Sequence, residues 1–115
     1  MSSRNKDERA HVNALIKAIQ KNSPGVYVHI DRDAGAIRHT SSGYDFLLAF
    51  DGRVVFVEAK EENGRLSDWQ EFTRSFIINA KCNYRVVRFW YDGEFFTVYD
   101  GKMIAIKDAT LQDFF

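Results

Sequence analysis

The chain has 115 residues, 45% of them hydrophobic and 15% aromatic, which suits one compact domain with a sizeable core. Its 16 basic and 16 acidic residues cancel, and this balance disfavours an indiscriminate polyanion binder. Cys82 is the only cysteine, so the sequence excludes an internal disulfide and a cysteine-based zinc site, and we expect a small buried hydrophobic residue there. Without a signal peptide or an apolar run of membrane length, we expect residues 1–115 to form one soluble, cytoplasmic domain with no membrane partner.

The first expected element is a helix over about residues 7–21, ended by the turn-forming stretch NSPG. Its apolar residues recur with a 3.6-residue period: Val12, Leu15, Ile16 and Ile19. Glu8 falls inside this stripe, so it either meets a polar partner or lies in a frayed first turn, where the helix dipole favours an acid. Residues 1–22 also carry a net charge of +3, which suits contact with phosphates and a solvated helix face equally.

Turn residues and β-branched or aromatic runs predict the remaining elements. In chain order they are a strand over residues 26–30, a hairpin over 44–60, a helix over 67–80, a strand over 84–91, a second hairpin over 94–107 and a short helical tail over 110–115. Residues 31–43 are expected to form a loop or a short irregular strand. This order predicts an α/β or α+β domain, with one mostly antiparallel sheet and at least two packed helices.

The first hairpin turns at Asp51-Gly52, a pair typical of type I′ turns because glycine tolerates a positive φ. If these are the two loop residues, Asp45 lies directly opposite Glu58, with Cβ atoms about 5 Å apart on one face of the sheet. Strand alternation places Lys60 on that same face. The pairing depends on the register, because a one-residue bulge near the turn would move Asp45 away from Glu58.

Two opposed carboxylates repel each other unless a cation, a lysine or solvent relieves the repulsion. A pair of carboxylates completed by water and a substrate phosphate is a ligand set that Mg²⁺ accepts. A lysine beside such an ion can orient a water for attack on a phosphodiester, so the cluster is consistent with metal-assisted hydrolysis. A cross-strand salt bridge at the solvent-exposed end of the hairpin explains the same three residues equally well.

The second expected helix has an apolar arc made of Leu66, Trp69, Phe72, Phe76, Ile77 and Ala80. Gln70 sits at the edge of this arc, from where its amide could reach inward to a phosphate or a metal-bound water. Ser67 and Gln70 also form the S-x-x-Q pattern of a capping box, which accounts for both residues without any chemistry. Taken alone, the cap is the better explanation.

In combination, SGYDFLLAF, a short hairpin, VVFVEAK, a glycine-containing loop and the helix start LSDWQ resemble the PD-(D/E)xK nuclease superfamily, and most closely its small VRR-NUC type. The resemblance covers about residues 8–91, with Tyr44 in the place of the proline expected before Asp45. It implies a restriction-endonuclease-like αβββαβ core, a central mixed sheet flanked by helices, to which this chain adds a C-terminal hairpin. The EAK strand end also resembles that of Holliday-junction resolvases in the same superfamily.

The resemblance implies a Mg²⁺- or Mn²⁺-dependent endodeoxyribonuclease that cuts branched, Holliday-junction-like DNA as a homodimer, in a bacterial or phage-infected cell. The residues that it assigns to the site are Asp45, Glu58 and the Ala59 carbonyl as metal ligands, Lys60 as the catalytic lysine, and Gln70 and Glu8 as assisting groups. The residues expected to contact DNA phosphates are Arg4, Lys6, Arg9, Arg38 and Arg65.

Two other functional classes stay open. One is a catalytically silent module with a nuclease-like fold that binds nucleic acid or protein without cutting. The other is an interaction domain whose exposed C-terminal strands bind a partner near Trp90 and Phe95.

Overall fold

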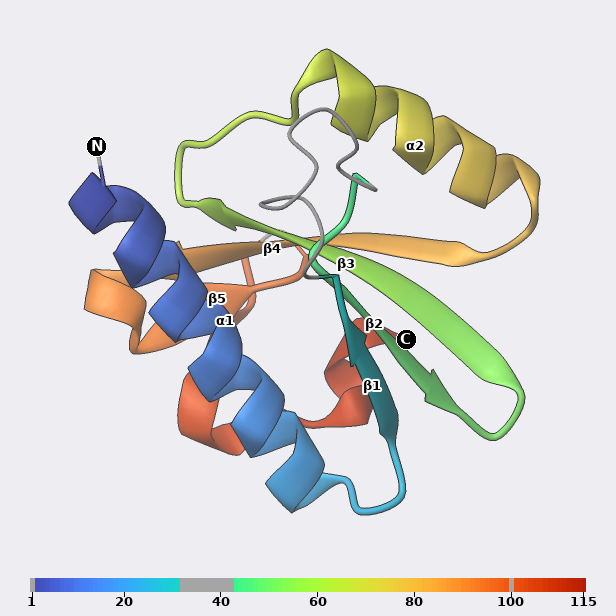
Figure 1. Cartoon of the computed structure of the whole chain (residues 1–115). Coiled ribbons are helices and arrows are strands. Elements are labelled where there is room, and N and C mark those ends of the chain that lie inside the picture. Colours follow the sequence, from blue (N-terminus) through green and yellow to red (C-terminus); the bar gives the residue numbers. More distant parts are fainter. Residues whose placement is uncertain (1, 32–42, 100) are drawn as a thin grey trace.

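The computed structural model describes residues 2–31, 43–99 and 101–115, with side chains from residue 8 onward (Figure 1). Its helices and strands, in chain order, are α1 (Ser2–Asn22), β1 (Tyr27–Ile30), β2 (Phe46–Phe50), β3 (Arg53–Glu61), α2 (Asp68–Asn79), β4 (Asn83–Trp90), β5 (Phe95–Thr97) and β6 (Met103–Ala105). Three short 3-10 helices follow β4, namely η2 (Tyr91–Gly93), η3 (Ile106–Asp108) and η4 (Leu111–Phe114). Most of the expected loop over residues 31–43 lies outside the described residues.

One mixed sheet of six strands, in the order β1-β2-β3-β4-β5-β6, forms the centre of the described fold. Neighbouring strands are antiparallel except β3 and β4, which are parallel and are connected through α2. The predicted α+β class with a mostly antiparallel sheet is therefore confirmed. Because β3 and β4 are parallel, their carboxyl ends meet at one edge of the sheet, where Glu61 pairs with Phe89.

α1 crosses one face of the sheet and buries its predicted apolar stripe there (Figure 1). Leu15 and Ile19 are fully buried, as are Val57 and Ala59 of β3 in the same core. The C-terminal 3-10 helices close this side of the molecule, and Phe114 also lies in the core. The position of α1 is held by polar contacts too, since the Asn22 side chain donates hydrogen bonds to the carbonyls of residues 107 and 109, at 3.0 and 2.8 Å.

The first hairpin has the predicted turn and register. Asp51 and Gly52 both adopt positive φ, 54° and 78°, as a type I′ turn requires. Pairing then runs without interruption from Phe50 opposite Arg53 to Phe46 opposite Val57. The bulge near the turn that would have moved Asp45 does not occur.

α2 lies on the other face of the sheet (Figure 1) and begins with the predicted capping box. Ser67 Oγ accepts a hydrogen bond from the Gln70 backbone N–H at 3.1 Å, and Gln70 Oε1 accepts one from the Ser67 backbone N–H at 2.8 Å. Both of these backbone donors would otherwise lack a partner at the start of the helix.

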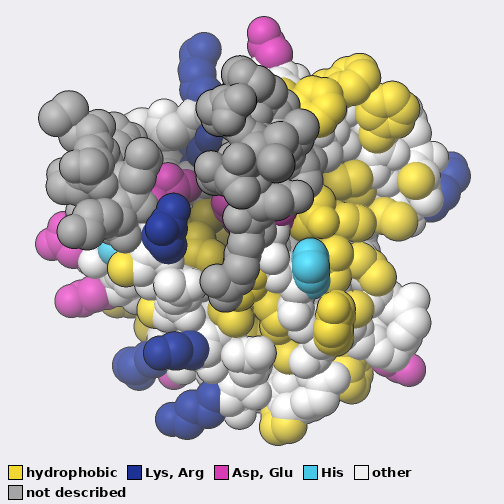
Figure 2. Space-filling model, viewed as in Figure 1, with side chains coloured by type: hydrophobic (Ala, Val, Ile, Leu, Met, Phe, Trp, Pro, Cys, Tyr) yellow, Lys and Arg dark blue, Asp and Glu magenta, His cyan; other side chains and the backbone are white. Residues whose placement is uncertain are grey.

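The orientation of α2 differs from the prediction. Trp69, Phe72 and Phe76 are 50%, 51% and 60% exposed, and no residue of α2 is buried. Figure 2 shows the resulting gathering of hydrophobic side chains at the upper right, over α2. The expectation that the apolar arc packs against the sheet is therefore wrong for its aromatic part. The half-buried residues on the inner side of this segment are Leu66, Gln70, Thr73 and Ile77, about 90° further round the helix.

Two contacts with other segments lie on the inner side of α2. The Gln70 amide reaches the sheet and donates a hydrogen bond to Glu58. Thr73 lies so close to Gly43 that a Cβ on this glycine would come within 2.6 Å of the Thr73 Cβ. Gly43 has a φ of 89° and its carbonyl accepts a hydrogen bond from the buried Tyr84 hydroxyl at 2.9 Å. A polar contact and a close backbone approach thus accompany the half-buried Leu66 and Ile77 on the inner side of this segment.

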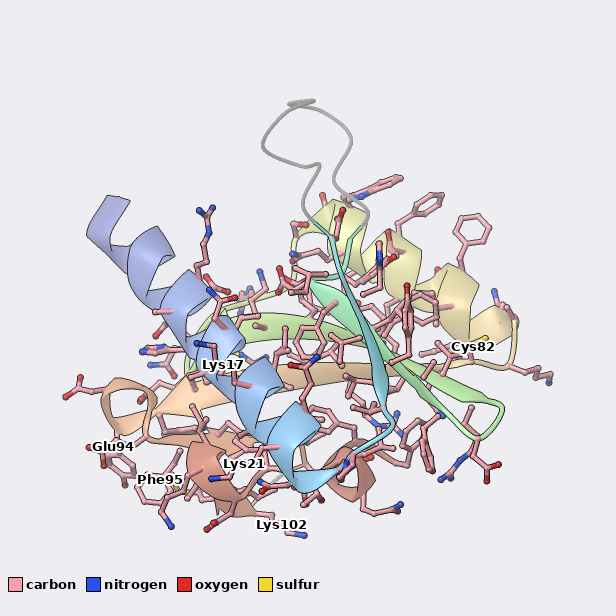
Figure 3. All side chains as sticks on the ribbon, turned by 60° about the horizontal axis from the view of Figure 1, so that its bottom comes forward. Lys17, Lys21, Cys82, Glu94, Phe95 and Lys102 are labelled. Atoms are coloured by element: carbon pink, nitrogen blue, oxygen red, sulfur yellow. The ribbon has the colours of Figure 1, made fainter. Side chains whose placement is uncertain are left out.

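Cys82, which was expected to be buried, is exposed (Figure 3). It follows Lys81, whose φ of 67° turns the chain between α2 and β4, so the cysteine lies at the surface before β4 begins. The chain between β4 and β5 forms the 3-10 helix η2, and Asp100, within the second predicted hairpin, lies outside the described residues. Among the helices that the structure describes, none is both long and apolar enough to cross a membrane.

Candidate metal and catalytic site

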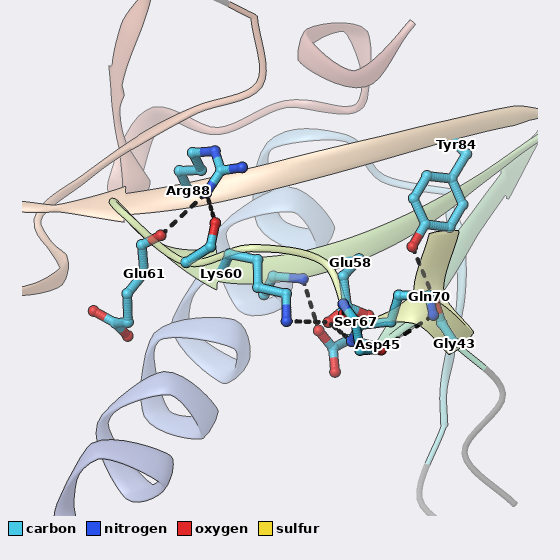
Figure 4. Close-up of polar contacts among 11 residues, drawn as sticks. Gly43, Asp45, Glu58, Lys60, Glu61, Ser67, Gln70, Tyr84 and Arg88 are labelled. Carbon is cyan, nitrogen blue, oxygen red and sulfur yellow. Dashed lines mark hydrogen bonds and ion pairs between the residues drawn. The ribbon is translucent and has the colours of Figure 1, made fainter. Parts of the chain in front are cut away.

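The predicted site residues gather where β2 begins and β3 nears its end (Figure 4). Asp45 lies one residue before β2, and its backbone N–H donates a hydrogen bond to the Val57 carbonyl at 2.8 Å. Since Phe46 also pairs with Val57, two residues of this strand face one of β3, as in a β-bulge. The predicted direct opposition of Asp45 and Glu58 is corrected in this detail.

At this end of the strand pair the Asp45 carboxylate, rather than a backbone carbonyl, accepts the next hydrogen bond from β3. Its Oδ2 accepts a hydrogen bond from the Ala59 backbone N–H at 2.7 Å. The N–H and C=O of one strand residue point to the same neighbour, so the Ala59 carbonyl is also directed toward the end of β2. The Asp45 carboxylate and the backbone of Ala59, both of them expected at the site, are thus in direct contact.

Glu58 is the one buried charged residue in the described part of the chain, at 4% exposure. Its Oε2 accepts a hydrogen bond from Gln70 Nε2 at 2.6 Å and lies 3.8 Å from Lys60 Nζ. The Lys60 side chain is itself only 19% exposed. A salt bridge is therefore present, but it joins two residues of β3 and does not lie at a solvent-exposed hairpin end, as the competing interpretation assumed.

Burial, followed by the nearby negative charge of Asp45, raises the pKa of Glu58 from its ordinary value of 4.5 to about 9, while the charge of Lys60 acts in the opposite direction. Burial also raises the pKa of Asp45, against the hydrogen bond from the Ala59 N–H and the charge of Lys60. Both carboxyl groups are thus poorly compensated as anions by the protein alone. A further cation near them would favour the ionised form of both.

Glu8 of α1 belongs to the same electrostatic cluster. Its charge is one of the causes that raise the pKa of Glu58, so α1 carries this acid toward the site as expected. Because α1 begins at Ser2 and has no acid in its first turn, the alternative role of Glu8 as a first-turn dipole partner is wrong.

Gln70 forms the predicted cap and also reaches inward, where its partner is the Glu58 carboxylate. Its Oε1 caps the start of α2 through Ser67, while its Nε2 donates to Glu58. One amide can do this because its oxygen and its nitrogen serve different partners. The cap therefore fixes the orientation in which the amide reaches the buried carboxylate.

Tyr84 and Arg88 of β4 lie at the site, although neither was among the candidates. Burial raises the pKa of Tyr84, and the charges of Glu58 and Asp45 raise it further. Arg88 pairs with Lys60 in the parallel ladder. It also donates hydrogen bonds to the carbonyls of Glu61 and Gly64, and these bonds connect β4 to the end of β3 and to the loop that follows it (Figure 4). Their position at the site follows from the parallel register of β3 and β4, which no local sequence pattern encodes.

The ligand set fits a hard divalent cation. Within the described ranges no group of three or more His, Cys, Asp or Glu side chains is placed to hold a metal ion. Mg²⁺, however, usually binds through one or two carboxylates and completes its octahedral shell with water and substrate phosphates. Asp45 and Glu58 could supply the two carboxylates of such a site, with the Ala59 backbone hydrogen-bonded to Asp45, and burial raises the pKa values of both acids.

The residues expected to contact DNA are only partly described. Arg9 on α1 and Arg65 between β3 and α2 are exposed. The side chains of Arg4 and Lys6, and the whole of Arg38, lie outside the described part of the structure.

No family model matches the chain, and neither a curated protein nor a solved structure is significantly similar to it.

Proposed function

We propose that this chain is a metal-dependent DNA endonuclease of the PD-(D/E)xK type, with a restriction-endonuclease-like core. The observation that supports it best is the convergence of Asp45, Glu58, Lys60 and Gln70 at one end of β3, with Glu58 buried and both carboxyl pKa values raised. A structural ion pair does not need a second, half-buried acid beside it, and such an acid destabilises the metal-free fold. Two adjacent carboxylates destabilise the fold without a cation and can bind one, so the pair favours a metal site.

The proposed chemistry is hydrolysis of a phosphodiester bond. Asp45, Glu58 and the Ala59 carbonyl would hold Mg²⁺ or Mn²⁺, which when bound supplies positive charge for the phosphate and makes a bound water more acidic. The Lys60 ammonium would orient the attacking water and stabilise negative charge on the phosphate oxygens. The Gln70 N–H fixes the orientation of the Glu58 carboxylate, and Glu8 assists from α1.

The proposed substrate is branched DNA, such as a four-way junction, and the proposed active form is a homodimer in a bacterial or phage-infected cell. These points derive from the sequence resemblance. The net charge of zero is compatible with them, because two copies would double the number of exposed arginines around one substrate.

The test is cleavage of a four-way junction and of a linear duplex of the same length, each with Mg²⁺, with Mn²⁺ and with chelator. We expect product from the wild type with either metal, and at least about a hundred-fold less from Asp45→Asn and Lys60→Ala. Asp51→Asn and Lys107→Ala, which change exposed residues of the same types, should cleave like the wild type. Equal cleavage by all five proteins, or none by the wild type, would refute the nuclease proposal.

A second candidate is a module of the same fold that binds nucleic acid without cutting it. The Lys60–Glu58 ion pair and the hydrogen bond from Gln70 favour it, since they partly compensate Glu58 without any metal. This candidate predicts junction binding that chelator does not weaken, with no product in either metal.

A further inference from the structure

α2 carries a surface that the proposed chemistry does not use. Trp69, Phe72 and Phe76, which we call the aromatic face, are at least half exposed. Their spacing of three and four residues places them within about 60° of each other on the helix. The rings are in contact along the helix, with centroids 5.5 Å apart between the first two and 4.8 Å apart between the last two.

The aromatic face is a continuous apolar strip of considerable size. Each of these side chains has roughly 200 Å² of surface, so half exposure leaves about 300 Å² in contact with water. Isolated exposed hydrophobic residues are ordinary, whereas contiguous patches of about this size or larger commonly mark binding sites. Figure 2 shows the strip on the open surface, with further hydrophobic side chains below it.

We infer that the aromatic face binds a second copy of this chain, with the two α2 helices antiparallel about a two-fold axis near Phe72. A strip with this spacing is the seam by which one helix packs against another. A two-fold contact requires a surface that complements itself, and a row of similar rings meets that requirement.

The charges at the two ends of α2 fit this arrangement. Asp68 and Glu71 lie in the first turn, no basic residue lies in the last turn, and the exposed Lys81 follows the helix. An antiparallel pair about Phe72 separates the two Asp68 side chains by about 12 Å along the helix axis, whereas a parallel pair would place them side by side. The opposite helix dipoles also lie side by side in this orientation.

The area agrees with a reversible dimer. Two aromatic faces would bury about 600 Å² of apolar surface, and at the roughly 65% apolar fraction of homodimer interfaces this implies about 900 Å² in all. That area is close to the approximate lower limit for a specific contact. The inference that the chain dimerises depends only on the surface of α2. Its link to cleavage of branched DNA rests on the proposed function. In such a dimer Gln70, which lies on the same helix, would connect each of the two sites to the interface.

Sedimentation velocity from about 1 µM to about 1 mM protein, in chelator, tests the association without any catalysis. We expect the wild type and Asp45→Asn to shift from monomer to dimer over this range. Phe72→Glu should stay monomeric, with at least about a hundred-fold weaker association. Ile78→Glu should dimerise normally, since Ile78 is also exposed, at 44%, but lies about 180° from Trp69 on the helix.

A mixing experiment identifies the occupant. Phe72→Glu and Phe72→Lys should each be monomeric but form a dimer when mixed, because an isologous contact near Phe72 places the two charges together. Trp69→Ser serves as a second monomeric variant. A wild type that stays monomeric throughout would overturn the inference, and so would a Phe72→Glu dimer as stable as the wild type. Loss of DNA affinity by Phe72→Glu in a chain that never dimerises would assign the face to nucleic acid instead.

Discussion

At the scale of single residues, the environment of Glu58 is built from opposing effects. The side chain is buried and lies near the negative charges of Asp45 and Glu8, which disfavour its ionised form. Lys60 acts in the opposite direction, but at 3.8 Å it is not in close hydrogen-bonding contact. The fold therefore disfavours the ionised form of this acid. As a result, the free energy of unfolding should depend on pH.

The first prediction concerns pH. Because the pKa of Glu58 is about 9 in the folded chain against 4.5 ordinarily, the folded state binds more protons than the unfolded state between these values. The free energy of unfolding in chelator should therefore fall as pH rises from about 4.5 to about 9. Glu58→Gln should remove this part of the slope and stabilise the protein at pH 8 by about 1–3 kcal/mol. Urea denaturation at several pH values measures both, and parallel curves for the two proteins would contradict the prediction.

The second prediction concerns metal. A divalent cation that binds the folded site stabilises it by mass action, by about 2.7 kcal/mol at a hundred times its dissociation constant. Since protons compete for the same two carboxyl groups, stabilisation by Mg²⁺ should increase between about pH 6 and pH 9. Thermal unfolding with and without Mg²⁺ measures this. Asp45→Asn should show little stabilisation, whereas Asp51→Asn, which alters an exposed turn residue, should behave as the wild type.

At the scale of elements, the start of α2 connects local helix stability to the site. The capping box sets where the helix begins, and the same Gln70 side chain crosses to Glu58 on β3. Gly43 adds a second constraint, because its close approach to Thr73 leaves no room for a side chain. Both contacts lie on the inner side of α2, and the aromatic face on its other side is exposed to water.

The third prediction separates the two roles of Gln70. Ser67→Ala removes the cap but leaves the amide donor, so it should lower the free energy of unfolding by about 0.5–2 kcal/mol with near-normal kcat under folding conditions. Gln70→Glu keeps an S-x-x-E capping box but replaces the N–H that bonds Glu58 with an acceptor. We expect it to lower kcat by about 10- to 100-fold and to move the titration of Glu58 to higher pH. Equal effects of both variants on kcat would show that Gln70 acts only through the helix.

At the scale of the whole molecule, charge balance governs how DNA could bind. The chain is neutral overall, so attraction to a polyanion must come from local clusters of exposed cations. Arg9 and Arg65 are such cations on elements next to the site. Lys17 and Lys21 project from the exposed side of α1, while Lys102 lies near the second hairpin (Figure 3).

The fourth prediction is a change in salt dependence. Each phosphate contact contributes about −0.9 to the slope of log K against log salt concentration on duplex DNA. Replacing Arg9 and Arg65 together by Ala should therefore reduce the magnitude of the slope by about 2, measured by anisotropy in an Asp45→Asn background that does not cleave. The matched control is Lys102→Ala with Lys107→Ala. A slope that changes as much in the control would show that the two arginines are not specific contacts.

Much of the fold follows from local signals along the chain. The 3.6-residue stripe of α1, the positive-φ pair Asp51-Gly52 and the capping box at Ser67 each depend on residues a few positions apart, and each is present as predicted. The hairpin register from Phe50 opposite Arg53 to Phe46 opposite Val57 follows from that turn, because the length of the loop fixes the pairing of the strands that it joins. The sequence alone therefore brought Asp45 next to the Glu58 strand and placed Lys60 nearby.

The tertiary structure decided what depends on contacts between distant segments. The parallel pairing of β3 with β4 brought Tyr84 and Arg88 to the site, and no local pattern encodes that register. The bulge at Asp45 and the burial of Glu58 arise from the meeting of three strands and two helices, which sets the solvent exposure of each charge. The side of α2 that faces inward also depends on distant segments, since Gln70 bonds Glu58 of β3 and Thr73 lies against Gly43.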